Sequence, residues 1–235
     1  MYGLAIWLYQ GEGGATLGRA DQVFWLKYFL SSQSAILWMC VLVLMSTVAY
    51  WMAMLGRSKN GFSGPLASAL AWSSVAAALV GSFVRWYESY LIGADVGHIP
   101  VSNLSEVFVL FCWMTTAFCL YFESKYGTRS FSAFAMLIVC AAVGFLVWYS
   151  AIREAHEIQP LVPALQSWWM KLHVPANFIG YGTFALAAMV AFAYLIKHSA
   201  GETRWLRIAP LWALGVVLCF EPLVFRRTVS AGAVY

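Results

Sequence analysis

The sequence predicts an all-α protein built as a polytopic bundle of membrane-spanning helices. Of its 235 residues, 62% are hydrophobic and only 10% are charged, whereas soluble domains average roughly 45–50% and 25%. A soluble domain of this size needs a polar surface that this composition cannot supply. The apolar residues also gather into stretches of about 20, the length at which a helix crosses the hydrocarbon layer. Both observations place the chain in a lipid bilayer.

Five stretches, taken in chain order, are long and apolar enough to be complete spans. They are about 34–55, 65–83, 104–122, 131–149 and 177–196. A partial span is predicted at each end: residues 2–9 are apolar but short, and residues 208–225 are interrupted by two prolines and a glutamate. We expect residues 1–235 to form one transmembrane domain, as a fragment of a larger helical bundle.

The basic residues of the loops predict which side of the membrane each loop faces. Loops 57–64, 123–130 and 197–207 hold seven Lys and Arg in 27 residues, whereas loops 11–33, 84–103 and 150–176 hold five in 70. Cytoplasmic loops retain an excess of basic residues, so we expect the first set to be cytoplasmic. The longer second set faces outward, and loops of 20-odd residues are often functional. The net charge of +4 is too small to indicate nucleic-acid binding.

None of the four histidines lies in the middle of a predicted span, which argues against a membrane cytochrome with paired ligands inside the bilayer and against a proton relay. His98 and His173 lie just outside spans on the outer side, His156 lies in an acidic loop, and His198 lies at a cytoplasmic helix end. The five cysteines fall in apolar stretches and form no Cys-x-x-Cys pair. We therefore expect neither a zinc site nor a thiol-disulfide reductase.

His173 follows a tryptophan pair in the segment Leu165-Gln-Ser-Trp-Trp-Met-Lys-Leu-His173-Val-Pro-Ala. Apolar residues recur there at helical spacing, which predicts a short amphipathic helix along the outer surface. Pro175 should then restart the chain as the next span. An imidazole beside Trp168 and Trp169 would suit a flat, apolar, iron-bearing ligand. The alternative is an interfacial aromatic belt with an incidental histidine.

His98 belongs to the segment Gly97-His98-Ile-Pro100-Val-Ser-Asn103-Leu-Ser-Glu106. Asn103, followed three residues later by Glu106, predicts a capping box that opens the helix beginning at Leu104. Glu106 also complements the helix dipole. Helix capping alone explains Asn103 and Glu106, and we assign His98 no bond to iron.

Together, Gly97-His-Ile-Pro-Val-Ser-Asn103 and Leu172-His-Val-Pro-Ala176 resemble the CcsA family (also called CcsB or ResC) of system II cytochrome c biogenesis. The resemblance covers roughly residues 7–196 and identifies residues 1–235 as an incomplete cytochrome c assembly-type domain. It implies a membrane component that binds haem b and presents it at the outer face for attachment to apocytochrome c, with His173 as an axial ligand to the haem iron. Trp168 and Trp169 would lie against the haem, whereas the roles of His98, Pro100, Asn103 and Glu106 stay open.

The resemblance further implies a ResB-like membrane subunit as partner, and the bacterial inner membrane in preference to the thylakoid membrane. Three departures are plain. The family's Trp-rich outer motif is absent, its further histidines are absent, and Ser105 stands where an aromatic residue is expected. We therefore expect the 235-residue chain alone to bind haem weakly or not at all, and to lack synthase activity. The alternative function is a non-catalytic membrane scaffold or a transporter-like bundle.

Overall fold

In the computed structural model, the described residues are 1–10, 15–56, 62–93, 96–153, 158 and 167–199, and their regular structure is helical, as the sequence predicts. The helices are α1 (Tyr2–Gln10), α2 (Arg19–Gln22), the π-helical segment η1 (Leu26–Leu30), α3 (Ser32–Leu55), α4 (Ser63–Ile92), α5 (Leu104–Tyr126), α6 (Arg129–Arg153) and α7 (Trp168–Ser199). Five of them, α3 to α7, are long and apolar enough to cross a membrane. All five predicted complete spans are therefore confirmed. The partial span at 208–225, and His156, lie outside the described residues.

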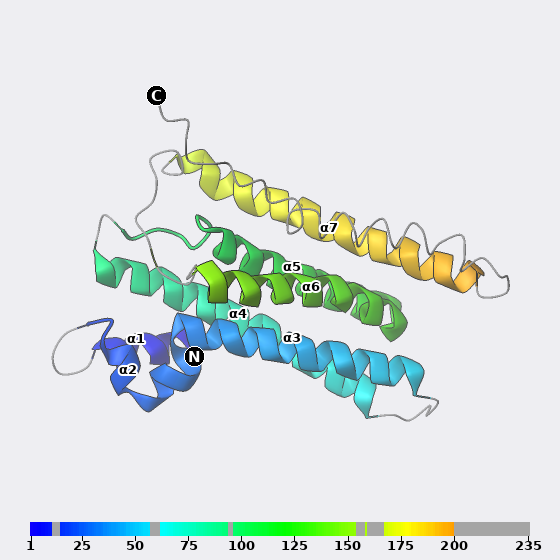
Figure 1. Cartoon of the computed structure of the whole chain (residues 1–235), viewed down its shortest axis with the longest axis horizontal. Coiled ribbons are helices and arrows are strands. Elements are labelled where there is room, and N and C mark those ends of the chain that lie inside the picture. Colours follow the sequence, from blue (N-terminus) through cyan, green and yellow to red (C-terminus); the bar gives the residue numbers. More distant parts are fainter. Residues whose placement is uncertain (11–14, 57–61, 94–95, 154–157, 159–166, 200–235) are drawn as a thin grey trace, which may run out of the picture. The chain divides into compact units, whose positions relative to one another are not determined.

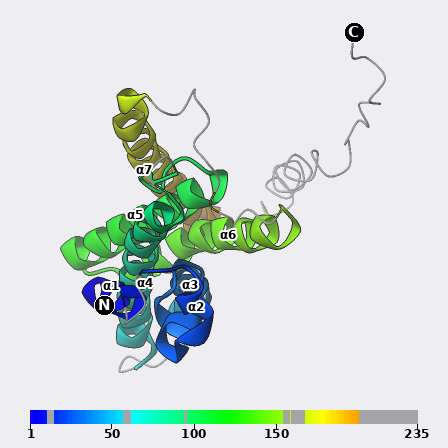
Figure 2. The same cartoon turned by 90° about the vertical axis from the view of Figure 1, so that its left-hand side faces the viewer.

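Helices α3 to α6 lie against one another in the bundle (Figures 1 and 2). Small side chains let them come close. The buried face of α4 shows why, because small residues recur on it every three or four positions. They are Ala67, Ala71, Ser74, Ala78 and Gly81. At Gly81 a methyl group would lie only 3.0 Å from the Ile36 side chain on α3. Small residues let helix backbones approach closely, which is how helices gain packing energy in lipid.

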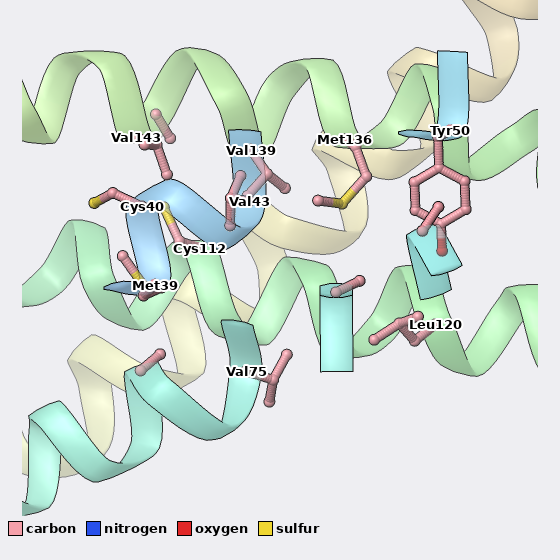
Figure 3. Packing of buried hydrophobic residues seen from close by; sticks show 14 of the residues in the cluster. Met39, Cys40, Val43, Tyr50, Val75, Cys112, Leu120, Met136, Val139 and Val143 are labelled. Carbon is pink, nitrogen blue, oxygen red and sulfur yellow. The ribbon is translucent and has the colours of Figure 1, made fainter. Parts of the chain in front are cut away.

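Figure 3 shows the apolar core that this packing creates, with side chains from all four helices meeting between them. The labelled side chains are Met39, Cys40, Val43 and Tyr50 from α3, Val75 from α4, Cys112 and Leu120 from α5, and Met136, Val139 and Val143 from α6. Cys112 and Cys119 are each 1% exposed. Their role is therefore packing.

A buried carboxylate ties the four helices together at one end of the bundle, which we call the Glu123 end. Glu123 on α5 accepts hydrogen bonds from the hydroxyls of Tyr50 (2.6 Å), Ser68 (2.5 Å) and Ser132 (2.6 Å), which come from α3, α4 and α6. Arg129 Nε lies 3.4 Å from the same carboxylate. Three hydroxyl donors and a cation replace the water that this charge loses on burial.

A second buried carboxylate fastens the N-terminal helices to the opposite end, which we call the His98 end. Glu88 on α4 accepts a 2.6 Å hydrogen bond from the Tyr9 hydroxyl of α1. The backbone N–H of Ser32 donates to it at 3.0 Å, and the Ser32 hydroxyl donates to its other oxygen. Helix α4 therefore continues to Ile92, beyond the predicted end of its span at 83. Its two charged residues there have partners inside the bundle: Glu88 accepts from α1 and α3, and Arg85 pairs with Glu106 on α5.

Helix α7 runs parallel to α5 with a constant offset of 67 residues. Phe178 meets Phe111 at 6.3 Å between ring centroids. Gly182 lies so close to Thr115 that a methyl group would be 2.8 Å from the threonine oxygen. Leu186 packs with Cys119. The same offset sets His173 level with Glu106, at the His98 end.

The prediction of a separate surface helix before Pro175 is wrong for the described residues. Trp168, Trp169 and His173 belong to the first turns of α7, and Pro175 lies inside this continuous helix. Proline removes only one backbone hydrogen bond, and membrane helices tolerate it more often than soluble ones. The described residues divide into a unit at 1–191 and a second unit of which only 192–199, the end of α7, are described.

Candidate functional site

A buried ion pair forms the centre of the His98 end. Arg85 Nε donates to Glu106 Oε1 at 2.6 Å, and the two side chains are only 5% and 4% exposed. Isolated buried charges are very costly, and they persist only when they are paired and hydrogen-bonded. The pair therefore joins α4 to α5 across the connection that carries His98.

The second oxygen of Glu106 organises the start of α5. Glu106 Oε2 accepts hydrogen bonds at 3.1 Å from the backbone N–H groups of Ser102 and Asn103, and from the Ser102 hydroxyl at 3.1 Å. With the Asn103 side chain on the backbone of Glu106, this completes the predicted capping box. One carboxylate thus serves both as a helix cap and as the partner of Arg85.

His98 is held in one orientation by its backbone and by its ring. The backbone N–H of His98 donates to the Ser89 hydroxyl at 3.2 Å, and the ring Nδ1 lies 2.6 Å from the Val96 carbonyl oxygen. Because a carbonyl only accepts, Nδ1 carries the proton, which in a neutral imidazole leaves Nε2 without one. Gly97 is required beside it, since a methyl group there would fall 2.3 Å from the Tyr90 ring.

Pro100 lines a cavity of about 390 Å³ between α3, α4, α5 and α6. The Arg85–Glu106 pair forms part of its wall, with polar side chains from each of the four helices. The polar lining residues are Gln33, Ser82, Arg85, Ser105, Glu106 and Ser150. Largely apolar cavities with a few convergent polar groups are typical of ligand sites.

His173 and the two tryptophans present a second feature at the same end. Trp168 is 63% and Trp169 is 72% exposed, with their rings edge to face at 5.8 Å. His173, one turn later on the same helix, is also exposed. Two large exposed indoles beside an exposed imidazole offer both an axial nitrogen and an apolar cover. Haem fits this set of side chains.

The structure thus places both predicted segments at one end of the bundle. Within the described chain, no group of three or more His, Cys, Asp or Glu is arranged to hold a metal ion. Arg85 and Ser89 are the residues that sequence reasoning missed. The charge of Arg85 within an otherwise apolar helix could have pointed to both, because charged residues inside membrane helices mark functional positions.

Comparison with known proteins agrees with the motifs. Residues 101–218 match the family model described as cytochrome C assembly protein. The chain is 30% identical over 182 residues to the cytochrome c biogenesis protein CcsA of Chlorella vulgaris, covering 76% of this chain and 54% of that protein. The CcsA protein of Gloeobacter violaceus is 31% identical over 158 residues, covering 66% and 43%.

The CcsA protein of Synechococcus elongatus is 27% identical over 156 residues, covering 66% and 45%. The chain therefore spans about half the length of these curated relatives. No solved structure matches it. The family match and the shared identity show that this chain belongs to the CcsA family of cytochrome c assembly proteins.

Proposed function

We propose that this protein takes part in cytochrome c biogenesis by binding haem and presenting it at the outer face of the membrane. Family membership supports the process. The exposed side chains of His173, Trp168 and Trp169 carry the finer proposal, because soluble and membrane proteins alike rarely leave two adjacent indoles uncovered without a partner or a lipid interface.

Each of these side chains has a distinct role in the proposed site. His173 would supply a nitrogen ligand to the haem iron, while Trp168 and Trp169 would cover the haem and exclude water. The haem itself supplies the vinyl groups that become thioethers with the Cys-x-x-Cys-His thiols of apocytochrome c. This chain's contribution is to hold the cofactor where those thiols can reach it, which is catalysis by positioning. A ResB-like subunit and the apocytochrome are the proposed partners, and the bacterial inner membrane is the proposed location.

The transporter-like alternative is less well supported by the described helices. Transporters place substrate near the bilayer midplane, at helices that are broken there. Here α3 to α6 are continuous, and the buried charged residues Arg85, Glu88, Glu106 and Glu123 all lie toward the helix ends. The absorption spectrum described next distinguishes a scaffold from a haem-binding protein.

The test is an absorption spectrum of the protein expressed from its whole gene with the ResB-like subunit and purified in detergent. We expect a Soret band from bound haem that is strongly reduced in His173→Gly. His198→Gly is the matched control, because His198 lies on the same helix at its other end and is also exposed. A scaffold would give no haem band, or the same band in all three proteins.

A further inference from the structure

The cavity at the His98 end has a polar side and an apolar side, and neither suits haem. Its apolar side comes from Ile36, Leu37, Cys40, Val109, Leu146 and Val147. Among the described residues, no histidine lines it, and Cys40 is the one sulfur-bearing side chain in its wall. Haem iron in proteins is held by His, Cys, Met or Tyr, and haem also carries two propionates that need cations. The cavity is therefore a site apart from the exposed residues His173, Trp168 and Trp169.

The charge balance of the lining selects a neutral ligand. Arg85 and Glu106 are the charged residues in the wall, and they neutralise each other at 2.6 Å. An anionic phosphate would meet the Glu106 carboxylate as well as the guanidinium. The remaining polar groups, the amide of Gln33 and the hydroxyls of Ser82 and Ser150, can donate hydrogen bonds to an uncharged oxygen.

The size and position of the cavity further restrict which ligands can fit. Ligand cavities run from about 300 to 1,000 Å³, so 390 Å³ holds a ring-sized group rather than a two-chain lipid. Leu37 on α3 and Val147 on α6 line it and are 60% and 47% exposed. A tail attached to the ring could therefore leave between these two spans into lipid.

We propose that this cavity binds the head ring of a membrane quinone, whose two carbonyl oxygens accept hydrogen bonds from the serine and glutamine side chains while its isoprenoid tail lies in the bilayer. Ser105 makes the site particular to this chain. It lines the cavity and is buried, so a larger side chain at this position would occupy the volume that the quinone ring takes.

The test measures binding of decylubiquinone to the purified protein in lipid nanodiscs, with decylbenzene as a probe that has the tail and a ring but no carbonyls. Two variants close the cavity: Ser105→Tyr fills it from α5, and Val147→Trp fills its lipid-facing side. Ser124→Tyr is the matched control, since Ser124 is exposed at the other end of α5 and does not line the cavity. Circular dichroism and size-exclusion profiles establish that each variant folds.

We expect saturable binding of one decylubiquinone by the wild type and by Ser124→Tyr, and binding at least about tenfold weaker in Ser105→Tyr and Val147→Trp. Decylbenzene should not compete. The proposal is overturned if the wild type shows no saturable binding, if the folded cavity variants bind as tightly as Ser124→Tyr, or if decylbenzene or a retained phospholipid occupies the site equally well. None of these measurements involves haem. A failure of the quinone proposal therefore leaves the haem proposal standing, and a failure of the haem proposal leaves the quinone proposal standing.

Discussion

Glu106 uses its two carboxylate oxygens for two different contacts, because Oε1 pairs with Arg85 on α4 and Oε2 accepts hydrogen bonds at the start of α5. Its three-residue spacing from Asn103 predicted a helix cap, and the capping box is present. Its bond to Arg85 could not be predicted, because the two residues are 21 positions apart and meet only when α4 and α5 pack. Local hydrogen bonds follow from spacing along the chain, whereas a buried ion pair depends on the tertiary fold. His173 was expected just outside a span, whereas it lies with Trp168 and Trp169 in the first turns of α7 rather than on a separate helix.

Removing one charge of the buried Arg85–Glu106 pair should destabilise the protein more than removing both charges. We expect Arg85→Met to lower the free energy of unfolding by about 3 kcal/mol, because it leaves the Glu106 carboxylate buried without its cation. The double variant Arg85→Met/Glu106→Gln should recover part of that loss, since the amide oxygen can still accept from the start of α5. Unfolding in mixed detergent measures both. An equal loss in the single and double variants would contradict a charge-pair role.

The Asn103 helix cap should contribute less to the free energy of unfolding than the buried ion pair does. We expect Asn103→Ala to destabilise the protein by about 1 kcal/mol, the usual effect of losing a helix N-cap. Asn103→Ser or Asn103→Asp should restore most of it, because both side chains cap helices well. The same unfolding experiment gives the values, and a loss that no capping residue restores would mean that Asn103 acts by another contact.

At the scale of helices, the sequence located the spans but not the contacts that fix their ends. Apolar length predicted α3 to α7, since that property needs only local composition. It did not predict that Glu88 would hold α1 and the start of α3, or that Glu123 would join four helices, because hydroxyl partners such as Tyr9 and Tyr50 carry no signal of their own. Nor could it show that α7 runs parallel to α5.

The anchor of α1 should make the protein sensitive to alkaline pH. Burial, reinforced by the Glu88 charge, raises the pKa of the Tyr9 phenol above its usual value of about 10. The folded protein then keeps a proton that the unfolded chain releases above pH 10, so this contribution to stability is present below pH 10 and is lost as pH rises further.

The melting temperature, followed from pH 8 to about pH 11, tests the role of this anchor. The decline should be shallower in Tyr9→Phe than in the wild type. Tyr121→Phe is the control, because Tyr121 is 56% exposed on α5. If the melting temperature of Tyr9→Phe falls with pH as steeply as that of Tyr121→Phe, the Tyr9 phenol is not the source of the alkaline sensitivity.

At the scale of the whole molecule, membrane orientation connects the fold to the proposed function. The chain alternates direction from α3 to α6, so the connection carrying His98 and the start of α7 share one end. The distribution of Lys and Arg predicts that this end faces outward. Orientation is established when the chain inserts into the membrane, so it is measured on the membrane-inserted protein.

Reporter fusions test the orientation directly. Fusions after residues 60, 127 and 200 should report the cytoplasm, and fusions after residues 92 and 160 the outer compartment. An inverted pattern would place His173 in the cytoplasm and would contradict presentation of haem at the outer face.

The proposed function depends above all on His173 as an iron ligand, and chemical rescue with imidazole is the sharpest test of that role. Cytochrome c synthesis is measured by haem staining in cells that express the whole gene with its partner subunit. We predict that His173→Gly lowers synthesis sharply, and that added imidazole partly restores it by occupying the vacated axial position. His198→Gly should be unaffected with or without imidazole. A loss in His173→Gly that imidazole does not repair would show that His173 serves packing rather than iron. Normal synthesis in that variant would mean that His173 is not needed to bind haem.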